Sequence, residues 1–323
     1  MIRLRFGRYA LIAGAVTMLT GCGAGREQSA LPGVPGNEAA QRAAGGDLLY
    51  VAHVEKKETS RYQGVLSVMT FPHGKTVATI ALPDFATGTC ADTSDDVWVV
   101  AEHYAYEYAR GGTTPIAKIH ITHTGKTTTG CAVDPTTGNL AVLTGFYEGS
   151  APSHIDVWPG AHEGKPVRYP ITFSPIACAY DGSGNLFVDG YVGSTVFFEL
   201  SELPKGSDST KNIQTKLYEF PGGVQWDGKY LAVFSGPVLY RISVSGSVAR
   251  VVSKYRPRHV YSGTPLAIAD GSMVADSGGN GTNVSLWHYP GGGKATKRLT
   301  SLEYAARGLT ISAGSSPQHN EAP

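Results

Sequence analysis

A β-hairpin pattern that recurs along the chain limits the fold more than any other feature. Each copy has a short apolar run, a turn rich in Asp, Gly, Thr or Ser and a second apolar run. Asp, Pro and Gly at these turn positions favour a tight connection between two strands. The opening residues lie 41, 47, 46 and 43 residues apart, at Cys90, Cys131, Cys178, Val224 and Ala267. A period in the low forties built of strands is typical of β-propeller blades.

Four strands can be assigned to each period, which predicts four-stranded blades. Residues 47–82 hold only three strands and lack an opening strand of their own. Gly308–Ala313 has the pattern of an opening strand, and Leu309 follows Ala267 by 42 residues. We therefore predict an all-β, six-bladed propeller over residues 46–313. Its C-terminal strand completes the first blade and closes the ring, which removes an exposed sheet edge.

Two of the hairpins carry a family resemblance. The runs from Asp134 (DPTTGNLAV) and Asp181 (DGSGNLFV) resemble the hairpins of NHL-repeat and SMP-30/gluconolactonase-like six-bladed propellers. The resemblance covers nearly all of the chain after its N-terminal segment and implies the propeller architecture. Such propellers include enzymes, binding proteins and scaffolds, so the architecture does not define an activity.

The N-terminal segment has the order of a bacterial lipoprotein signal peptide. Arg3, Arg5 and Arg8 precede an apolar run that is too short to span a bilayer. The run ends in Leu19-Thr20-Gly21-Cys22, which resembles a lipobox. The resemblance implies cleavage before Cys22, lipid on its thiol and anchoring to a membrane by acyl chains. An ordinary signal peptide and a short membrane anchor are the alternatives.

These features predict four parts of the chain. Residues 1–21 are the signal peptide, 22–45 the lipidated Cys and a flexible tether, 46–313 the propeller and 314–323 a polar tail. The protein is expected at the cell envelope, on its periplasmic or extracellular side, in the outer membrane if the host has one. After cleavage 24 basic and 26 acidic residues remain, and this net charge of −2 gives no electrostatic case for nucleic-acid binding.

Three cysteines open successive repeats. Cys90, Cys131 and Cys178 align with the apolar residues of the other repeats, where a cysteine behaves as a small hydrophobic residue. Equivalent strands of neighbouring blades are expected to lie too far apart for the Cα separation that a disulfide allows. We therefore predict three buried, unpaired cysteines, although an oxidising compartment would favour disulfides.

Polar residues are predicted to gather at one mouth of the central channel, where each second strand ends and the next blade begins. Aligning the second strands places one column there, made of His53, Glu102, Thr144, Gly190, Ser235 and Asp276. Residues beside it or in the following loops are His103, Asp189, His123, Arg256, Arg258 and His259. Polar groups of mixed sign around a channel mouth suit a small molecule or a metal ion. Taken singly, each is more simply a solvated residue at a strand end.

The predicted function is a binding or scaffolding module at the cell envelope, with a protein or glycan partner at one mouth of the channel. The alternative is a metal-dependent hydrolase or lyase. The resemblance to SMP-30-like enzymes implies a divalent cation such as calcium, for which Glu102, Asp189 and Asp276 are the candidate ligands. His53, Glu102 and His103 are candidates for a lyase that resembles the streptogramin-inactivating propellers. The family's ligands cannot be matched residue by residue, so we assign no catalytic residue and no cofactor.

Overall fold

The computed structural model describes residues 45–57, 62–122, 127–145, 153–192, 195–260, 265–277 and 282–314. The predicted signal peptide, Cys22, the tether up to residue 44 and the tail from residue 315 lie outside the described residues. No helix in the described ranges is long and apolar enough to cross a membrane.

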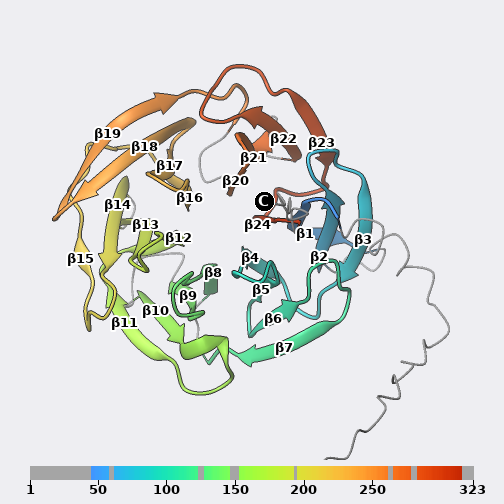
Figure 1. The fold of residues 1–323 in the computed structure, drawn as a ribbon, viewed down its shortest axis with the longest axis horizontal. Helices are drawn as coiled ribbons and strands as arrows, with labels where there is room; N and C mark the ends of the chain where they lie inside the picture. The colour runs from blue at the N-terminus through green and yellow to red at the C-terminus, as the bar shows by residue number, and fades with distance from the viewer. Residues whose placement is uncertain are drawn as a thin grey trace, which may run out of the picture. The chain divides into compact units, whose positions relative to one another are not determined.

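Six four-stranded antiparallel sheets form a ring around a central axis, which confirms the predicted fold (Figure 1). The first strand of each blade lies nearest the axis and the fourth lies at the rim. The first three blades contain β24 (Gly308–Ser312), β1 (Leu48–Lys56), β2 (Tyr62–Thr70) and β3 (Thr76–Ala81); β4 (Ala86–Ala91), β5 (Val97–Ala101), β6 (Tyr104–Tyr108) and β7 (Pro115–His120); and β8 (Thr127–Val133), β9 (Leu140–Gly145), β10 (Ser153–Trp158) and β11 (Val167–Ile171).

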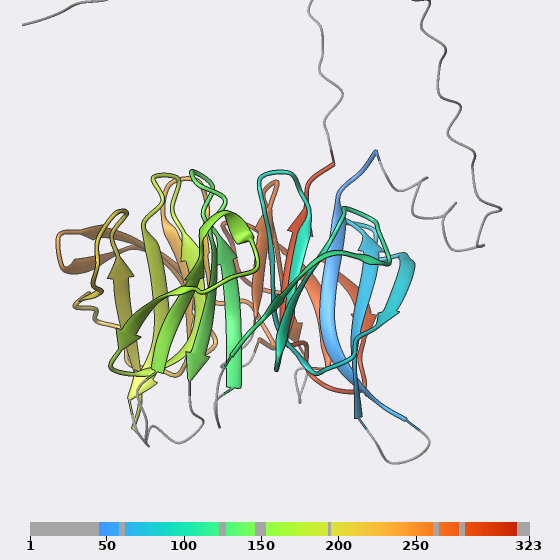
Figure 2. The same ribbon diagram turned by 90° about the horizontal axis from the view of Figure 1, so that it is seen from below.

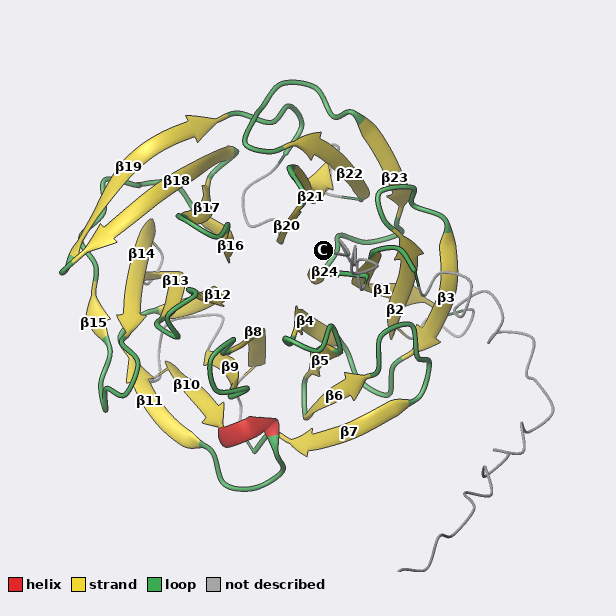
Figure 3. Cartoon of the chain, viewed as in Figure 1, coloured by secondary structure: helices red, strands yellow, loops and turns green. Residues whose placement is uncertain are grey.

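The other three blades are built in the same way. They contain β12 (Ser174–Tyr180), β13 (Leu186–Val192), β14 (Thr195–Leu203) and β15 (Lys211–Asn212); β16 (Pro221–Trp226), β17 (Leu231–Ser235), β18 (Val238–Ser245) and β19 (Val248–Tyr255); and β20 (Leu266–Ala269), β21 (Ser272–Ser277), β22 (Asn283–His288) and β23 (Lys297–Ser301). A short 3₁₀ helix, η1 (Pro159–Ala161), follows β10 (Figure 3).

The C-terminal strand β24 closes the ring as predicted. It pairs antiparallel with β1, with Leu309 opposite Val51. The described ends also meet, because the Gly314 N–H donates a hydrogen bond to Asp47 Oδ1 at 2.8 Å. Both ends lie at the mouth that carries the turns between first and second strands, here called the turn mouth (Figure 2). The opposite mouth, where the second strands end, is here called the exit mouth.

The turn aspartates explain why the hairpin recurs. Oδ1 of Asp134 accepts hydrogen bonds from the N–H and the hydroxyl of Thr136. Oδ1 of Asp181 accepts from the N–H groups of Ser183 and Asn185. An Asp that bonds to the backbone two residues further on stabilises a tight turn, so this residue type fixes each hairpin locally.

Apolar side chains fill the spaces between neighbouring blades. Trp98 and Trp158 lie in the cluster between the second and third blades, and Trp287 lies between the fifth and sixth. All three are fully buried. Stability therefore comes from the faces of the sheets, while the first strands are left to form the wall of the channel.

The prediction of three unpaired cysteines was wrong for two of them. Cys90 and Cys131 form a disulfide with a Cα–Cα distance of 5.8 Å, while Cys178 is free and buried. Cys90 lies two residues before its turn aspartate, Asp92, whereas Cys131 lies three residues before Asp134. A shift of one residue turns a strand side chain to the opposite face. Cys90 therefore faces the third blade and meets Cys131, which faces the second.

The outermost strand of the fourth blade also differs from the sequence pattern. The pattern favours residues 214–220, but the strand is the two-residue β15, which pairs with β14. Gln214 instead forms a parallel bridge with Val248 of the fifth blade. The segment after β15 thus leaves the rim of its own blade to approach the next one.

Candidate functional site

A cavity of about 700 Å³ opens at the exit mouth, where the first strands of the blades begin. Glycines set its shape. A Cβ added to Gly88 would lie 2.8 Å from Gly130 Cα, and one on Gly308 would lie 2.6 Å from Thr89 N. The first strands of the first three blades can approach one another only because these positions lack side chains. The same positions leave the floor of the cavity without bulky groups.

Hydroxyl groups line one side of this floor. The Thr87 and Thr128 hydroxyls are 2.6 Å apart, and the Thr128 hydroxyl also donates to the Ala101 carbonyl at 3.1 Å. Thr129, the residue after Thr128, lines the cavity as well. Its buried hydroxyl oxygen has no hydrogen-bond partner among the described residues. A buried hydroxyl without a partner is costly, so this oxygen is suited to a ligand group or a water.

Aromatic side chains form the rim. Tyr62 and Tyr304 pack edge to face with ring centroids 5.5 Å apart. Tyr191 and Phe220 pack at 5.2 Å. Phe85, which is 42% exposed, lies where the chain enters the second blade. An aromatic rim above a hydroxyl-bearing floor suits a small organic ligand with both apolar and polar parts.

Of the predicted site residues, Glu102 is the one that lines the cavity. It is half-buried, and Arg307 is a cationic residue of the same lining. His53 is buried instead, with its Nε2 3.0 Å from the Ser67 hydroxyl, and burial lowers the pKa of the imidazole. A second strand lies inside its sheet, so its side chains face neighbouring blades rather than the axis.

Asp189 and Asp276 show the same effect. Asp189 Oδ1 accepts the N–H of Ala177 at 2.9 Å, and Asp276 Oδ2 accepts the N–H of Ala306 at 3.0 Å. Burial raises the pKa of Asp189 well above its usual value and that of Asp276 to about 8. Both carboxyls hold backbone near the exit mouth and do not line the cavity. The structure therefore does not bring the three proposed calcium ligands together.

The remaining candidates lie elsewhere. His103 is exposed and its carbonyl accepts the Ile121 N–H, but it is not part of the cavity lining. His259 lies with Arg256 in a separate concavity at the start of the sixth blade. His123 lies outside the described residues.

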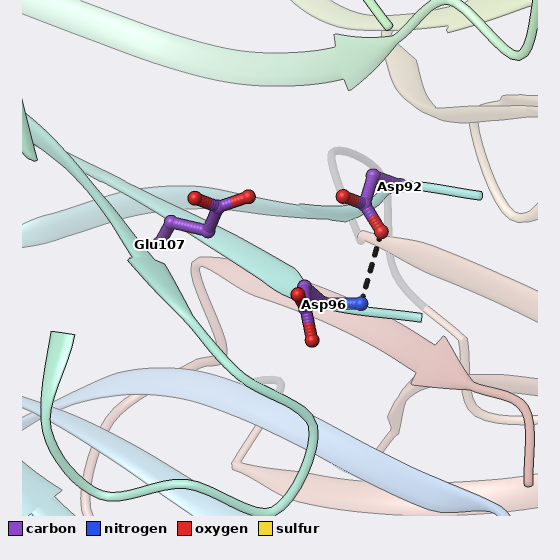
Figure 4. Close-up of side chains that lie close together, drawn as sticks. All are labelled: Asp92, Asp96 and Glu107. Atoms are coloured by element: carbon purple, nitrogen blue, oxygen red, sulfur yellow. Dashed lines mark hydrogen bonds between the residues drawn. The ribbon is translucent and has the colours of Figure 1, made fainter. Parts of the chain in front are cut away.

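Sequence reasoning missed a carboxylate cluster at the turn mouth. Asp92, Asp96 and Glu107 each bring an oxygen to within 4.8 Å of the others (Figure 4). Burial raises the pKa of Asp92 and Glu107, and the neighbouring carboxylates raise both further. Carboxylate oxygens are ligands that calcium prefers, but calcium takes about six to eight oxygen ligands in all, carbonyls and waters included. The available signal was Glu107, an acid within the apolar strand β6.

Comparisons with known proteins show the fold. No family model matches the chain, and no curated protein matches it. A protein of unknown function from Bacteroides caccae aligns with a TM-score of 0.60 and 13% identity, over 82% of this chain and 98% of that one. A functionally unknown protein from Desulfotomaculum acetoxidans aligns at 0.52 and 12%, over 83% and 99%. The Kuenenia stuttgartiensis hydrazine synthase aligns at 0.53 and 12%, over 71% and 80%. The resemblance to NHL-repeat and SMP-30-like proteins stays a prediction.

Proposed function

We propose that this chain is a lipid-anchored binding protein of the cell envelope that takes a small organic ligand into the cavity at the exit mouth. The cavity carries the proposal: about 700 Å³, an aromatic rim and a hydroxyl-bearing floor. This volume lies within the range of small-molecule sites in proteins, which combine apolar walls with a few polar groups. The buried Thr129 hydroxyl is one such polar group.

The disulfide supports the envelope location. Disulfides form and persist mainly in oxidising compartments, such as the periplasm and the cell exterior. The Cys90–Cys131 disulfide joins two blades deep in the ring. A chain with a lipobox-like Leu19–Cys22 and a buried inter-blade disulfide fits export followed by lipidation at Cys22.

The position of the described ends supports an orientation. Gly45 lies beside Gly314 at the turn mouth, and 22 residues separate it from Cys22. We propose that these residues form the tether predicted from the sequence, and a coil of that length spans about 25 Å on average. An anchor at Cys22 would hold the turn mouth close to the membrane and leave the exit mouth, with its cavity, accessible to ligands from the compartment.

A metal-dependent hydrolase or lyase is less well supported. Such an enzyme needs a set of ligands that converges beside the substrate. Glu102 is the one proposed ligand in the cavity lining, since Asp189 and Asp276 bind backbone N–H groups inside the wall.

Two experiments test the proposal. Metabolic labelling with an alkyne fatty acid should label the wild-type chain and leave Cys22→Ser unlabelled and soluble. Small molecules that copurify with the chain from its host should be lost from Thr129→Trp, which fills the cavity, at unchanged circular dichroism. The same molecules on Thr129→Trp would contradict binding in the cavity, and label on Cys22→Ser would contradict the anchor.

A further inference from the structure

Two arginines and a histidine line a second concavity, on the segment that joins β19 to β20. Arg256, Arg258 and His259, together with Pro237, Pro257 and Val260, enclose about 460 Å³. From the sequence we predicted these three residues at the channel mouth, but none of them lines the channel cavity. The concavity is therefore a separate feature of the surface, here called the basic concavity.

The backbone beneath the basic concavity is held in place on both sides. Pro257 is buried and forms a parallel bridge with Gly293. Gly293 accepts the N–H of Arg258 at 2.6 Å and donates its own N–H to the Arg256 carbonyl at 3.0 Å. A Cβ on Gly292 would lie 2.9 Å from Arg256 N. The Gly-rich loop after β22 thus fits against this segment and fixes the Cα atoms that carry the two arginines.

The local geometry gathers the charges. Arg256 and Arg258 flank the buried Pro257, and residues two apart in an extended segment project to the same side. Both arginines are exposed. His259 has a φ of 66°, in the left-handed region that is uncommon for residues other than Gly and that recurs at functional sites.

The described residues do not neutralise the charges of the two guanidinium groups. Arg256, Arg258 and His259 have no ion pair or side-chain hydrogen bond to any described residue, whereas Arg168 and Arg241 each pair with an aspartate. Further cations stand close in sequence, since Lys254 precedes Arg256 by two residues and Lys294 follows the bridging Gly293. Glu219 packs against Gly236, next to Pro237, but makes no ion pair with the described cations. The concavity therefore carries an excess of positive charge.

We propose that the basic concavity binds a phosphate group. A guanidinium presents a planar fork of N–H donors that matches phosphate oxygens two at a time. Two guanidinium groups and an imidazole offer donors to three oxygens, which a phosphate monoester has and a carboxylate lacks. The phosphate monoester can belong to a soluble molecule or to the headgroup of phosphatidic acid, since both present the same three terminal oxygens.

Isothermal titration calorimetry on the full-length chain tests this. The probes are inorganic phosphate, glycerol 3-phosphate and, as a carboxylate comparison, acetate. We expect saturable binding of glycerol 3-phosphate, at least tenfold weaker in Arg256→Gln/Arg258→Gln. The matched control is Lys216→Gln/Arg250→Gln, which removes the same charge from exposed positions outside the concavity and should keep the affinity within twofold.

Short-chain dihexanoyl phosphatidic acid, used as a monomer, separates the two sources, because its phosphate is a monoester like that of glycerol 3-phosphate. Tighter binding of this lipid than of glycerol 3-phosphate would assign a lipid headgroup, and equal or weaker binding a soluble ester. If the Gln variant unfolds, Arg256→Lys/Arg258→Lys keeps the charge and loses the fork, and it should still bind several-fold more weakly. Three results would each overturn the proposal. They are no saturable binding of any phosphate probe, an equal loss of affinity in the control variant, and binding of acetate as tight as that of glycerol 3-phosphate.

Discussion

Cys90 and Cys131 face each other across the interface between the second and third blades, although they open equivalent repeats. The pairing registers show how. Cys90 lies opposite Trp98, a position that corresponds to Ala132 opposite Ala141 in the next blade. Cys90 is thus the structural equivalent of Ala132, and not of Cys131.

Removing this disulfide should destabilise the propeller. The disulfide links residues 41 positions apart. By chain entropy, closing a loop of that length stabilises the folded protein by about 4 kcal/mol. We expect Cys90→Ala/Cys131→Ala to lower the unfolding free energy by about 2–4 kcal/mol in urea titrations. Reductant should destabilise the wild type and leave the double variant unchanged. Equal unfolding curves for both proteins, with and without reductant, would contradict the disulfide.

The same strand register predicts a second, engineered disulfide. Ala132 and Cys178 are buried in one cluster between the third and fourth blades, in the positions that Cys90 and Cys131 occupy one blade earlier. Ala132→Cys should therefore form a disulfide with Cys178, seen by peptide mapping without reductant. Ala179→Cys is the control, because the equivalent residue of the fifth blade is Val224 and the new thiol should stay free. A free thiol in Ala132→Cys would show that the register is wrong.

Asp276 should make stability fall as the pH rises. Burial raises its pKa to about 8 in the folded protein, against about 4 in the unfolded chain. The contribution of the protonated Asp276 carboxyl to folding stability is therefore complete below about pH 4, and it is lost as the pH rises through 8. The slope approaches about 1.4 kcal/mol per pH unit at most. The unfolding free energy of Asp276→Asn, measured in urea, should therefore increase relative to that of the wild type as the pH rises from 5 to 9. A difference that does not vary with pH would show that the buried carboxyl does not titrate in this range.

The carboxylate cluster at the turn mouth predicts that removal of the Glu107 charge stabilises the protein at neutral pH. Burial raises the pKa of Glu107, and the charges of Asp92 and Asp96 raise it further. The protonated Glu107 therefore contributes stability that is fully present below its pKa in the unfolded chain. This stability is lost as the pH rises through its pKa in the folded protein. In EDTA at pH 7, Glu107→Gln should raise the melting temperature by roughly 1–2 °C, with no gain at pH 4. The exposed Glu163→Gln should change neither value. A lower melting temperature for Glu107→Gln at pH 7 would mean that the carboxylate is stabilising there.

The sequence was sufficient for the architecture because propeller hairpins are local. Each turn aspartate stabilises its own hairpin, so blade number and ring closure follow from spacing alone, as the pairing of β24 with β1 shows. The cysteine pair could also have been found by counting back from Asp92 and Asp134. The first apolar residue of each repeat does not stand at a constant distance from its turn aspartate, and this conceals the offset of one residue between Cys90 and Cys131.

The candidate site was less predictable, for two physical reasons. Alignment of the second strands collected residues that share a height along the axis, but their side chains point between blades, as His53 and Asp276 show. The cavity rim instead comes from strand ends and connections with no common spacing, such as Phe85 and Tyr304. Such residues come together only when the ring closes.

Ligand-observed NMR tests the central claim, that the exit-mouth cavity binds a small organic ligand. The probe is a library of soluble small molecules, screened by saturation transfer against the full-length chain. Phe220→Ala removes a ring from the rim, and Tyr218→Ala removes an exposed ring two residues away that is not part of the lining. The account predicts hits that Phe220→Ala weakens at least tenfold and Tyr218→Ala leaves unchanged. Hits that both variants weaken equally, or that neither weakens, would contradict it.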